Sequence, residues 1–204
     1  NEILDDRLAE WFLKKEIKIK GDWSHQRNNI APGGWAFQFN NDFYPDVDDT
    51  ALVGMFLDRY NRKKKRIDVR NALERTRKWI VSMQSDNGGW GAFDINNTHH
   101  SLNSIPFADH GALLDPPTAD VSARCLSFLK QMNNNNDKNC IDKAINFLIL
   151  EQENNGSWYG RWGTNYIYGT WSVLSALNLV EFKDKEQVFD KAVNYLIKMQ
   201  RKDG

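Results

Sequence analysis

The 204-residue chain has few cysteines, no net charge and no long apolar run. Its two cysteines, Cys125 and Cys140, do not make a disulfide framework, so we expect a reducing compartment. Basic and acidic residues both number 27, so no global electric field attracts nucleic acid, and we exclude nucleic-acid binding. No stretch approaches the ~20 apolar residues that a membrane-spanning helix needs, and no signal peptide is recognisable.

The chain is long enough for one domain with a substantial core. Its unusual feature is the aromatic content of 8 Trp, 11 Phe and 6 Tyr, because several of these residues lie in glycine-rich loops rather than in helical stripes. The chain does not begin with Met, and residues 199–204 start a pattern that is completed twice upstream. We therefore expect it to be part of a longer protein.

That pattern is Gln-x-x-x-Gly-x-Trp after a helix, with 68 and then 48 residues between successive glutamines at 84, 152 and 200. We expect the glycine to end the helix in a left-handed turn, and the tryptophan to fold back so that its ring packs on the glutamine amide and its N–H finds a partner. This arrangement would staple successive helices together. Glu16 and Trp23 suggest a degenerate first copy.

Helical periodicity accounts for most of the chain. Helices are predicted over residues 3–17, from 49 to about 60, over 69–84, from 118 to 129, and from 166 to 177, and the basic run 62–66 is predicted to be a solvated linker. Strand-type alternation is nearly absent. The prediction is an all-α fold of alternating helices with inserted loops on one side.

Three carboxylates lie within four residues, where Asp46, Asp48 and Asp49 follow an aromatic segment and open an apolar helix. Ionised together they would repel one another, so in a partly dry site at least one should stay protonated at neutral pH. The same residues also suit a surface turn in which Pro45 sets the bend and Asp46 or Asp49 caps the helix.

With these motifs in order along nearly the whole chain, the sequence resembles the squalene–hopene cyclases, within the class II triterpene cyclases. The matching segments are 32–37 (PGGWAF), 46–49 (DVDD), the two complete Gln-to-Trp repeats, 105–107 (IPF), 115–120 (DPPTAD) and 160–163 (GRWG). The resemblance implies a partial α/α barrel, or toroid, stapled by these repeats. Residues 1–204 would be an incomplete part of the catalytic barrel domain of a larger two-domain enzyme.

The resemblance also implies roles for the charged residues. Asp48 matches the proton donor, Asp46 and Asp49 match its partners, and Asp120 matches an aspartate that supports the acid through hydrogen bonds. Arg124 occupies a position that holds His in some relatives, which leaves open how the acid is reprotonated. A fixed cation there would favour ionised Asp46 and leave the proton on Asp48, but a simple i,i+4 ion pair with Asp120 fits almost as well.

By resemblance, the reaction protonates the terminal alkene of squalene and starts a carbocationic cyclisation to hopene- or hopanol-type products. Aromatic faces stabilise such cations by about 0.5–2 kcal/mol each without trapping them. Positions that match the cavity lining are Phe37, Phe93, Trp162 and Tyr168, which without the family would equally suit an ordinary core. Positions that match the constriction where substrate enters from the membrane are Phe107 and Ala108.

The resemblance further implies a monotopic protein on the cytoplasmic side of a membrane, with a homodimer as one arrangement and no cofactor. No metal is expected, because the four histidines lack ligand spacing.

Rival classes fit less well. A class I terpene synthase needs Asp-Asp-x-x-Asp and a calcium loop needs alternating oxygen ligands, and residues 50–52 break both patterns. A protein prenyltransferase needs a zinc set that we cannot assemble. The paired acids of a glycoside hydrolase usually lie far apart in sequence. A cyclase of oxidosqualene or another polyprene, and a non-catalytic helical-repeat fragment, stay open.

Overall fold

The computed structural model describes residues 2–26, 29–38, 40–99, 101 and 114–203. Within them, helices dominate and a two-stranded antiparallel ribbon is the one sheet. The elements, in chain order, are α1 (Glu2–Lys15), η1 (Asp22–Gln26), β1 (Trp35–Ala36), β2 (Pro45–Asp46), α2 (Val47–Lys64), α3 (Ile67–Ser82), α4 (Ala119–Met132), η4 (Asn135–Asp137), α5 (Lys138–Leu150), α6 (Asn165–Leu177) and α7 (Lys185–Met199).

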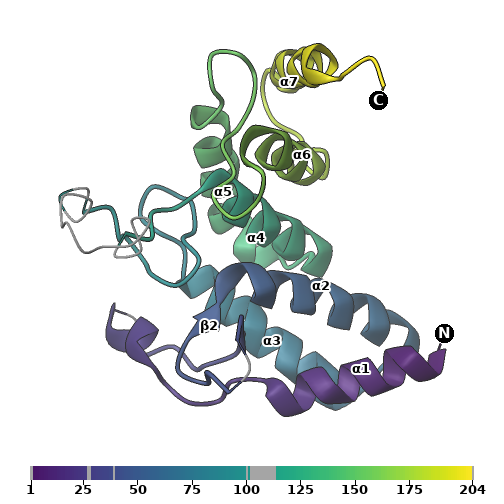
Figure 1. Ribbon diagram of the computed structural model, residues 1–204. Helices are drawn as coiled ribbons and strands as arrows, with labels where there is room; N and C mark the ends of the chain where they lie inside the picture. Colours follow the sequence, from purple (N-terminus) through teal and green to yellow (C-terminus); the bar gives the residue numbers. More distant parts are fainter. Residues whose placement is uncertain (1, 27–28, 39, 100, 102–113, 204) are drawn as a thin grey trace.

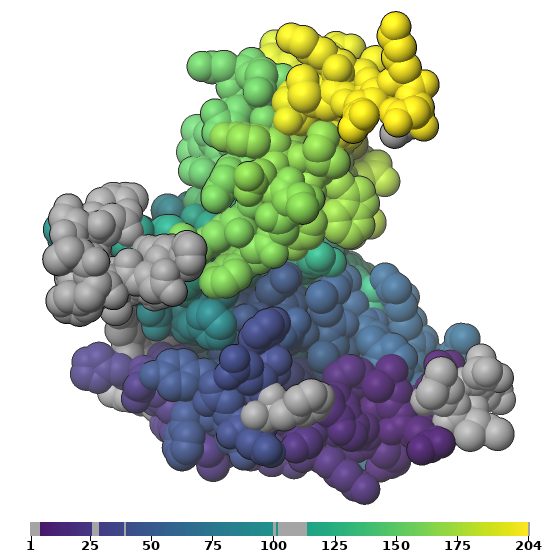
Figure 2. All heavy atoms as spheres, viewed as in Figure 1, coloured from purple at the N-terminus to yellow at the C-terminus, as the bar shows by residue number. Residues whose placement is uncertain are grey.

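The helices form two rows, as the all-α prediction requires. The first row consists of α2, α4 and α6, in which α2 contacts α4 and α4 contacts α6 (Figure 1). The second row consists of α3, α5 and α7, which pack against α2, α4 and α6 respectively. The space-filling view places the yellow C-terminal residues at one end of the molecule and the purple and blue N-terminal residues at the other (Figure 2). The helices form a partial helical toroid, which confirms the predicted fold class.

The Gln-to-Trp repeat acts as the predicted staple. After α3, the indole N–H of buried Trp90 donates to the carbonyl of Ile80 at 2.7 Å. The Gln84 amide donates to two carbonyls at 2.9 Å, that of Gly88 in its own loop and that of Cys140 in α5. The glutamine therefore ties the end of one helix to the start of the next helix in the same row.

The second copy repeats this geometry between α5 and α7. Trp158 donates from its indole N–H to Leu148 at 2.6 Å, and Gln152 donates to Gly156 and to Val188 in α7, both at 3.0 Å. Since the partners occupy equivalent places, the repeat is a structural unit, and the prediction that its tryptophans serve packing is confirmed.

One detail of the repeat differs from the prediction. The helix α3 ends at Ser82 and is capped by Met83 in a right-handed conformation, before the glutamine, so the glycine does not end it. Gly88 and Gly156 instead lie in the loops with φ +92°, and a β-carbon there would come within 2.5 Å of the Lys143 carbonyl or 2.3 Å of the Lys191 carbonyl. The left-handed turn is needed so that the loop can approach the next helix closely.

A variant of the staple follows α1. Both oxygens of buried Glu16 accept hydrogen bonds at 2.7 Å from Arg75 in α3, so a salt bridge replaces the glutamine contact. Trp23 packs edge-on against Trp79 with ring centroids 5.8 Å apart.

The prediction of a solvated linker over residues 62–66 is correct in part: residues 62–65 are exposed and residues 65–66 join α2 to α3, but residues 62–64 are helical. Arg62, Lys63 and Lys64 form the last turn of α2, and Lys65 caps that helix in the left-handed conformation with φ 53°. Cations at a helix C-terminus are favoured by the helix dipole, which explains the position of the run.

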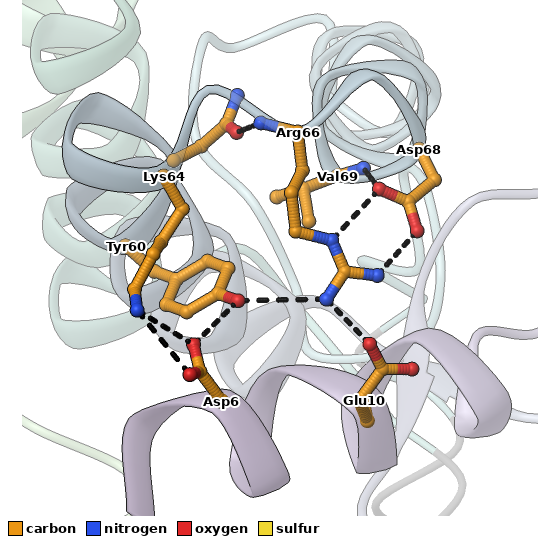
Figure 3. Close-up of polar contacts among 8 residues, drawn as sticks. Asp6, Glu10, Tyr60, Lys64, Arg66, Asp68 and Val69 are labelled. Carbon is orange, nitrogen blue, oxygen red and sulfur yellow. Dashed lines mark hydrogen bonds and ion pairs between the residues drawn. The ribbon is translucent and has the colours of Figure 1, made fainter. Parts of the chain in front are cut away.

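Arg66, the next residue, holds the corner between α1, α2 and α3 (Figure 3). Its guanidinium forms ion pairs with Glu10 of α1 and with both oxygens of Asp68, and contacts the Tyr60 hydroxyl at 3.4 Å. That hydroxyl donates to Asp6 of α1 at 2.9 Å. Arg66, the last residue of the basic run, therefore belongs to a tertiary junction.

Candidate active site

The acid motif sits where the ribbon meets α2. Asp46 is the last residue of β2 and the N-cap of α2, and its Oδ1 accepts the Asp49 amide at 2.8 Å. The capping interpretation is therefore correct for Asp46, and the helix begins at Val47, two residues earlier than predicted. Asp46 is buried, so one side chain both caps the helix and belongs to the acid cluster.

Two contacts hold this helix start in place. The Thr50 hydroxyl accepts the backbone N–H of Trp35 in β1 at 2.9 Å. The Val47 N–H donates to the Ala92 carbonyl at 2.8 Å. The acid motif is thus attached to the ribbon on one side and to the loop after Trp90 on the other.

Burial sets the protonation of the cluster. It raises the pKa of Asp46 to about 7, and the charges of Asp49 and Asp48 add to the increase. Burial also raises the pKa of Asp48 to about 6, where Arg124 opposes the rise and Asp120 adds to it. The pKa of Asp49 is raised by burial as well. All three carboxyl groups of the motif therefore have raised pKa values, the direction that the sequence led us to expect.

Arg124 forms its ion pair with Asp48, whereas the sequence led us to expect Asp46 or Asp120 as its partner. Its Nε lies 3.3 Å from Oδ1 of Asp48, and Arg124 forms no ion pair with Asp46 or Asp120 among the described residues. Asp120 is almost fully buried and accepts the backbone N–H of Trp162 at 3.0 Å through Oδ2. The cation therefore acts on Asp48, while Asp120 ties α4 to the loop before α6.

Residues of α6 complete the surroundings of Arg124. The guanidinium carbon lies 5.5 Å from the ring centroid of Trp171. Burial raises the pKa of Tyr168, and a hydrogen bond with Arg124 opposes that rise. Arg124 and Trp171 border a groove of about 610 Å³ between α2, α4 and α6.

The structure brings together two of the four predicted aromatic residues. Phe93 and Trp162 pack edge to face, with ring centroids 6.2 Å apart and planes at 88°. Phe37 is 70% exposed and lines a separate cavity of about 290 Å³ that includes Asp49. Phe107 and Ala108 lie outside the described residues.

Several residues that shape the site carried no assigned role in the sequence prediction. Asp115 binds the loop that holds Phe93, Arg161 stacks on Trp162, and Trp171 stacks on Arg124. Each occurs in or near a recognised motif, but the identity of its partner depends on loops that meet only in the fold.

This arrangement suits proton donation to a very weak base. A carboxyl group whose pKa is raised toward neutral pH can act as a Brønsted acid, and aromatic faces nearby can stabilise the resulting cation. Among the described residues no three His, Cys, Asp or Glu side chains are arranged so that they could hold a metal ion. None of the helices described combines the length and the apolar character of a membrane span.

A family model described as the squalene-hopene cyclase C-terminal domain matches residues 4–204. The chain belongs to the squalene-hopene cyclase family. It is 57% identical over 178 residues to the squalene-hopene cyclase of Schizosaccharomyces japonicus, covering 87% of this chain and 26% of that protein. It is 50% identical over 198 residues to the enzyme of Bradyrhizobium diazoefficiens, covering 96% of this chain and 30% of that protein. The chain thus spans under a third of the length of these curated relatives.

Solved structures agree on the fold. The type II terpene cyclase MstE from Scytonema, in its apo form, matches 97% of this chain and 49% of its own with a TM-score of 0.63 and 16% identity. The ent-copalyl diphosphate synthase from Streptomyces platensis matches 87% of this chain and 30% of its own, with a TM-score of 0.59 and 13% identity. At these identities the likeness concerns the fold alone.

Proposed function

We propose that the protein is a class II triterpene cyclase that protonates the terminal alkene of squalene and directs its polycyclisation to hopene- or hopanol-type products. The observation that carries the proposal is Asp48. This carboxyl has a raised pKa, lies against Arg124, and belongs to an acid cluster whose helix start is bonded to the loop that carries Phe93. The names of the relatives support squalene as the substrate.

In the proposed reaction Asp48 gives its proton to the CH carbon of the terminal alkene, which leaves the positive charge on the carbon that carries two methyl groups. The alkene π pair forms the new C–H bond, and the neighbouring carbon becomes a tertiary cation. Each following alkene then supplies its π pair to the cation and closes a ring. Loss of a proton ends the cascade as a hopene, whereas capture of water followed by proton loss ends it as a hopanol.

The other residues would set the acidity and guide the cation. Asp46 and Asp49 are the proposed partners of Asp48, and the negative charges of Asp49 and Asp120 would make Asp48 harder to ionise. The charge of Asp120 would raise the pKa of Asp48, and the charge of Arg124 would lower it.

Aromatic faces would stabilise the cation as it moves along the chain, by about 0.5–2 kcal/mol each. The proposed aromatic wall consists of Phe37, Phe93, Trp162 and Tyr168. Phe107 and Ala108 are proposed to form the constriction through which substrate enters.

Because squalene is a hydrocarbon that dissolves in membranes, we also propose a monotopic protein that takes its substrate from the cytoplasmic side. Residues 1–204 would be an incomplete part of the catalytic α/α-barrel domain, and the whole protein could form a homodimer. Since the chain spans 26–30% of its relatives' length, we expect the isolated 204 residues to be inactive.

The test uses the full-length protein in membranes supplied with squalene, with products identified by mass spectrometry. Asp48→Asn should lose cyclisation by several orders of magnitude, because the amide cannot donate a comparable proton. Asp58→Asn, on the same helix but ion-paired with Arg62, should keep wild-type turnover. Normal products from Asp48→Asn would end the acid hypothesis.

The same assay separates the alternatives. Supplying oxidosqualene and a shorter linear polyprene beside squalene would identify a cyclase with another substrate, and no turnover of any of them would favour a non-catalytic helical-repeat protein.

A further inference from the structure

The carboxylate of Asp115 holds the loop that carries Phe93. It accepts three consecutive backbone N–H groups, from Ala92 at 3.0 Å, from Phe93 at 2.6 Å and from Asp94 at 2.8 Å. Asp115 is 7% exposed, so these bonds form away from bulk water. Hydrogen bonds from backbone N–H groups to a buried carboxylate are among the stronger ones in proteins. The conformation of residues 92–94 therefore depends on this side chain.

The same loop reaches the acid motif. The N–H of Ala92 bonds Asp115, whereas the carbonyl of Ala92 accepts the N–H of Val47 at 2.8 Å. Val47 is fully buried and lies between Asp46 and Asp48 in sequence. A displacement of Ala92 would therefore move the first turn of α2, where the proposed acid sits.

The residue before Asp115 anchors the second aromatic loop. The carbonyl of Leu114 accepts a hydrogen bond from Nη2 of Arg161 at 2.8 Å, and the guanidinium of Arg161 lies 5.3 Å from the ring centroid of Trp162. The dipeptide Leu114–Asp115 is thus bonded to both loops whose rings, Phe93 and Trp162, meet edge to face.

The backbone at Gly91 lies close to the Asp115 carboxylate and leaves no room for a side chain. A β-carbon on Gly91 would come within 2.8 Å of the Asp115 Oδ2 atom and within 2.6 Å of its carbonyl oxygen. The loop can approach the carboxylate this closely because residue 91 has no side chain.

We propose that Asp115 is a positioning residue for the cyclisation. It holds the Phe93 ring against Trp162 and fixes the position of this aromatic pair relative to the acid motif. The inference rests on the proposed function. Asp115 does not touch the reacting atoms; it acts through Ala92, Phe93 and Val47. A general structural carboxylate would stabilise the fold without favouring one product, whereas a positioning residue also affects where the cascade stops.

The test compares Asp115→Asn with Asp94→Asn in the full-length protein. Asparagine keeps the shape of Asp115 but presents an NH₂ group to backbone donors. Asp94→Asn removes an equal charge from the same loop and leaves all three bonds, since Asp94 contributes its backbone N–H. The first readout is amide hydrogen exchange. We expect the amides of residues 92–94 to exchange at least 10-fold faster in Asp115→Asn and at the wild-type rate in Asp94→Asn.

The second readout is the product distribution from squalene. We expect Asp115→Asn to lower kcat by about 10- to 100-fold and to increase incompletely cyclised products. Its by-products should match those of Phe93→Ala, and adding Asp115→Asn to Phe93→Ala should change the product ratios little, because both changes remove the same ring from the wall.

The outcomes are distinguishable. Unchanged exchange at residues 92–94 in Asp115→Asn overturns the proposed loop contact, and faster exchange with wild-type products overturns the positioning role. If wild-type protein converts no polyprene, the proposed function itself fails, whatever the exchange rates show. Should Asp115→Asn not fold, Arg161→Lys tests the other end of the anchor: it should yield similar incomplete products, and wild-type products from it would contradict the inference.

Discussion

The Nε atom of Arg124 lies 3.3 Å from Oδ1 of Asp48, so a permanent cation in the second turn of α4 faces the proposed acid at the start of α2. Burial raises the pKa of Asp48 to about 6, and the positive charge of Arg124 opposes that rise. Burial and the charges of Asp49 and Asp48 raise the pKa of Asp46 to about 7. Arg124 therefore limits the pH range in which Asp48 is protonated.

Replacing Arg124 with Gln should move the alkaline limb of the kcat profile to higher pH. The cation lowers the pKa of Asp48, so its removal raises that pKa, and the protonated acid then persists at higher pH. A nearby opposite charge typically accounts for about 1–3 pKa units. The measurement is kcat against pH for squalene conversion. Arg59→Gln, which removes an exposed cation farther along α2, should leave the limb in place. A limb that stays or moves to lower pH in Arg124→Gln contradicts this role.

Asp46→Asn should stabilise the protein at high pH and not at low pH. The pKa of Asp46 is raised from 3.8 to about 7 in the fold, so ionisation opposes folding: the cost is absent below about pH 4 and complete above about pH 7. Asparagine carries no charge and remains a good N-cap. We expect a gain on the order of a few kcal/mol at pH 8.

This gain is measured by urea unfolding of the full-length protein between pH 4 and pH 8. Asp142→Asn removes a carboxylate that is exposed on α5, so its effect should not grow with pH. A pH-independent effect of Asp46→Asn would show that residue 46 is not buried in its neutral form.

Local patterns in the sequence were sufficient for most of the fold. Helical periodicity located the starts of α1, α2, α3, α4 and α6 to within about two residues, because each buries one continuous apolar face, whereas the predicted ends of α2 and α4 were three to four residues short. The Gln-to-Trp repeat also specified its own contacts: Trp90 bonds a carbonyl ten residues earlier, a distance that the chain spans locally. The pKa values of the three clustered aspartates could be expected to rise, because carboxylates this close together repel one another in a partly dry site.

Contacts between distant segments could not be derived in this way. Arg66 follows four basic residues, and charge patterning alone favours solvent for such a run; its partner Glu10 is 56 residues away. Arg124 had two plausible acidic partners in sequence and paired with a third, Asp48. The role of Asp115 depends on a turn 21 to 23 residues earlier that folds back over its carboxylate.

Arg66→Met should destabilise the protein in a salt-dependent manner. Methionine keeps the aliphatic part of the side chain but loses the contacts with Glu10, Asp68 and Tyr60 that join α1 to the corner of α2 and α3. A partly exposed network of this kind contributes about 1 kcal/mol at low ionic strength, and less in about 0.5 M salt because charges are screened.

Urea unfolding at both salt concentrations provides the comparison. Arg70→Met is the matched control, because Arg70 is exposed on α3 and makes no ion pair among the described residues. Equal losses in the two variants, or a loss in Arg66→Met that does not change with salt, would indicate that the network does not hold α1.

The glutamine staples should each carry measurable stability. Gln84→Met leaves the carbonyls of Gly88 and Cys140 without the amide donor, and Gln152→Met does the same to Gly156 and Val188. Loss of a partner for part-buried carbonyls costs about 1–3 kcal/mol. We expect each variant to lower the free energy of unfolding by that amount.

The two losses should also add in the double variant, because the staples share no residue. Gln187→Met, at an exposed position of α7, should change the free energy of unfolding by less than about 0.5 kcal/mol. If Gln84→Met and Gln152→Met behaved like this control, the indole N–H bonds of Trp90 and Trp158 would hold the helix rows together without help from the glutamines. A loss in the double variant well above the sum would instead mean that the two staples act cooperatively along the row from α3 to α7.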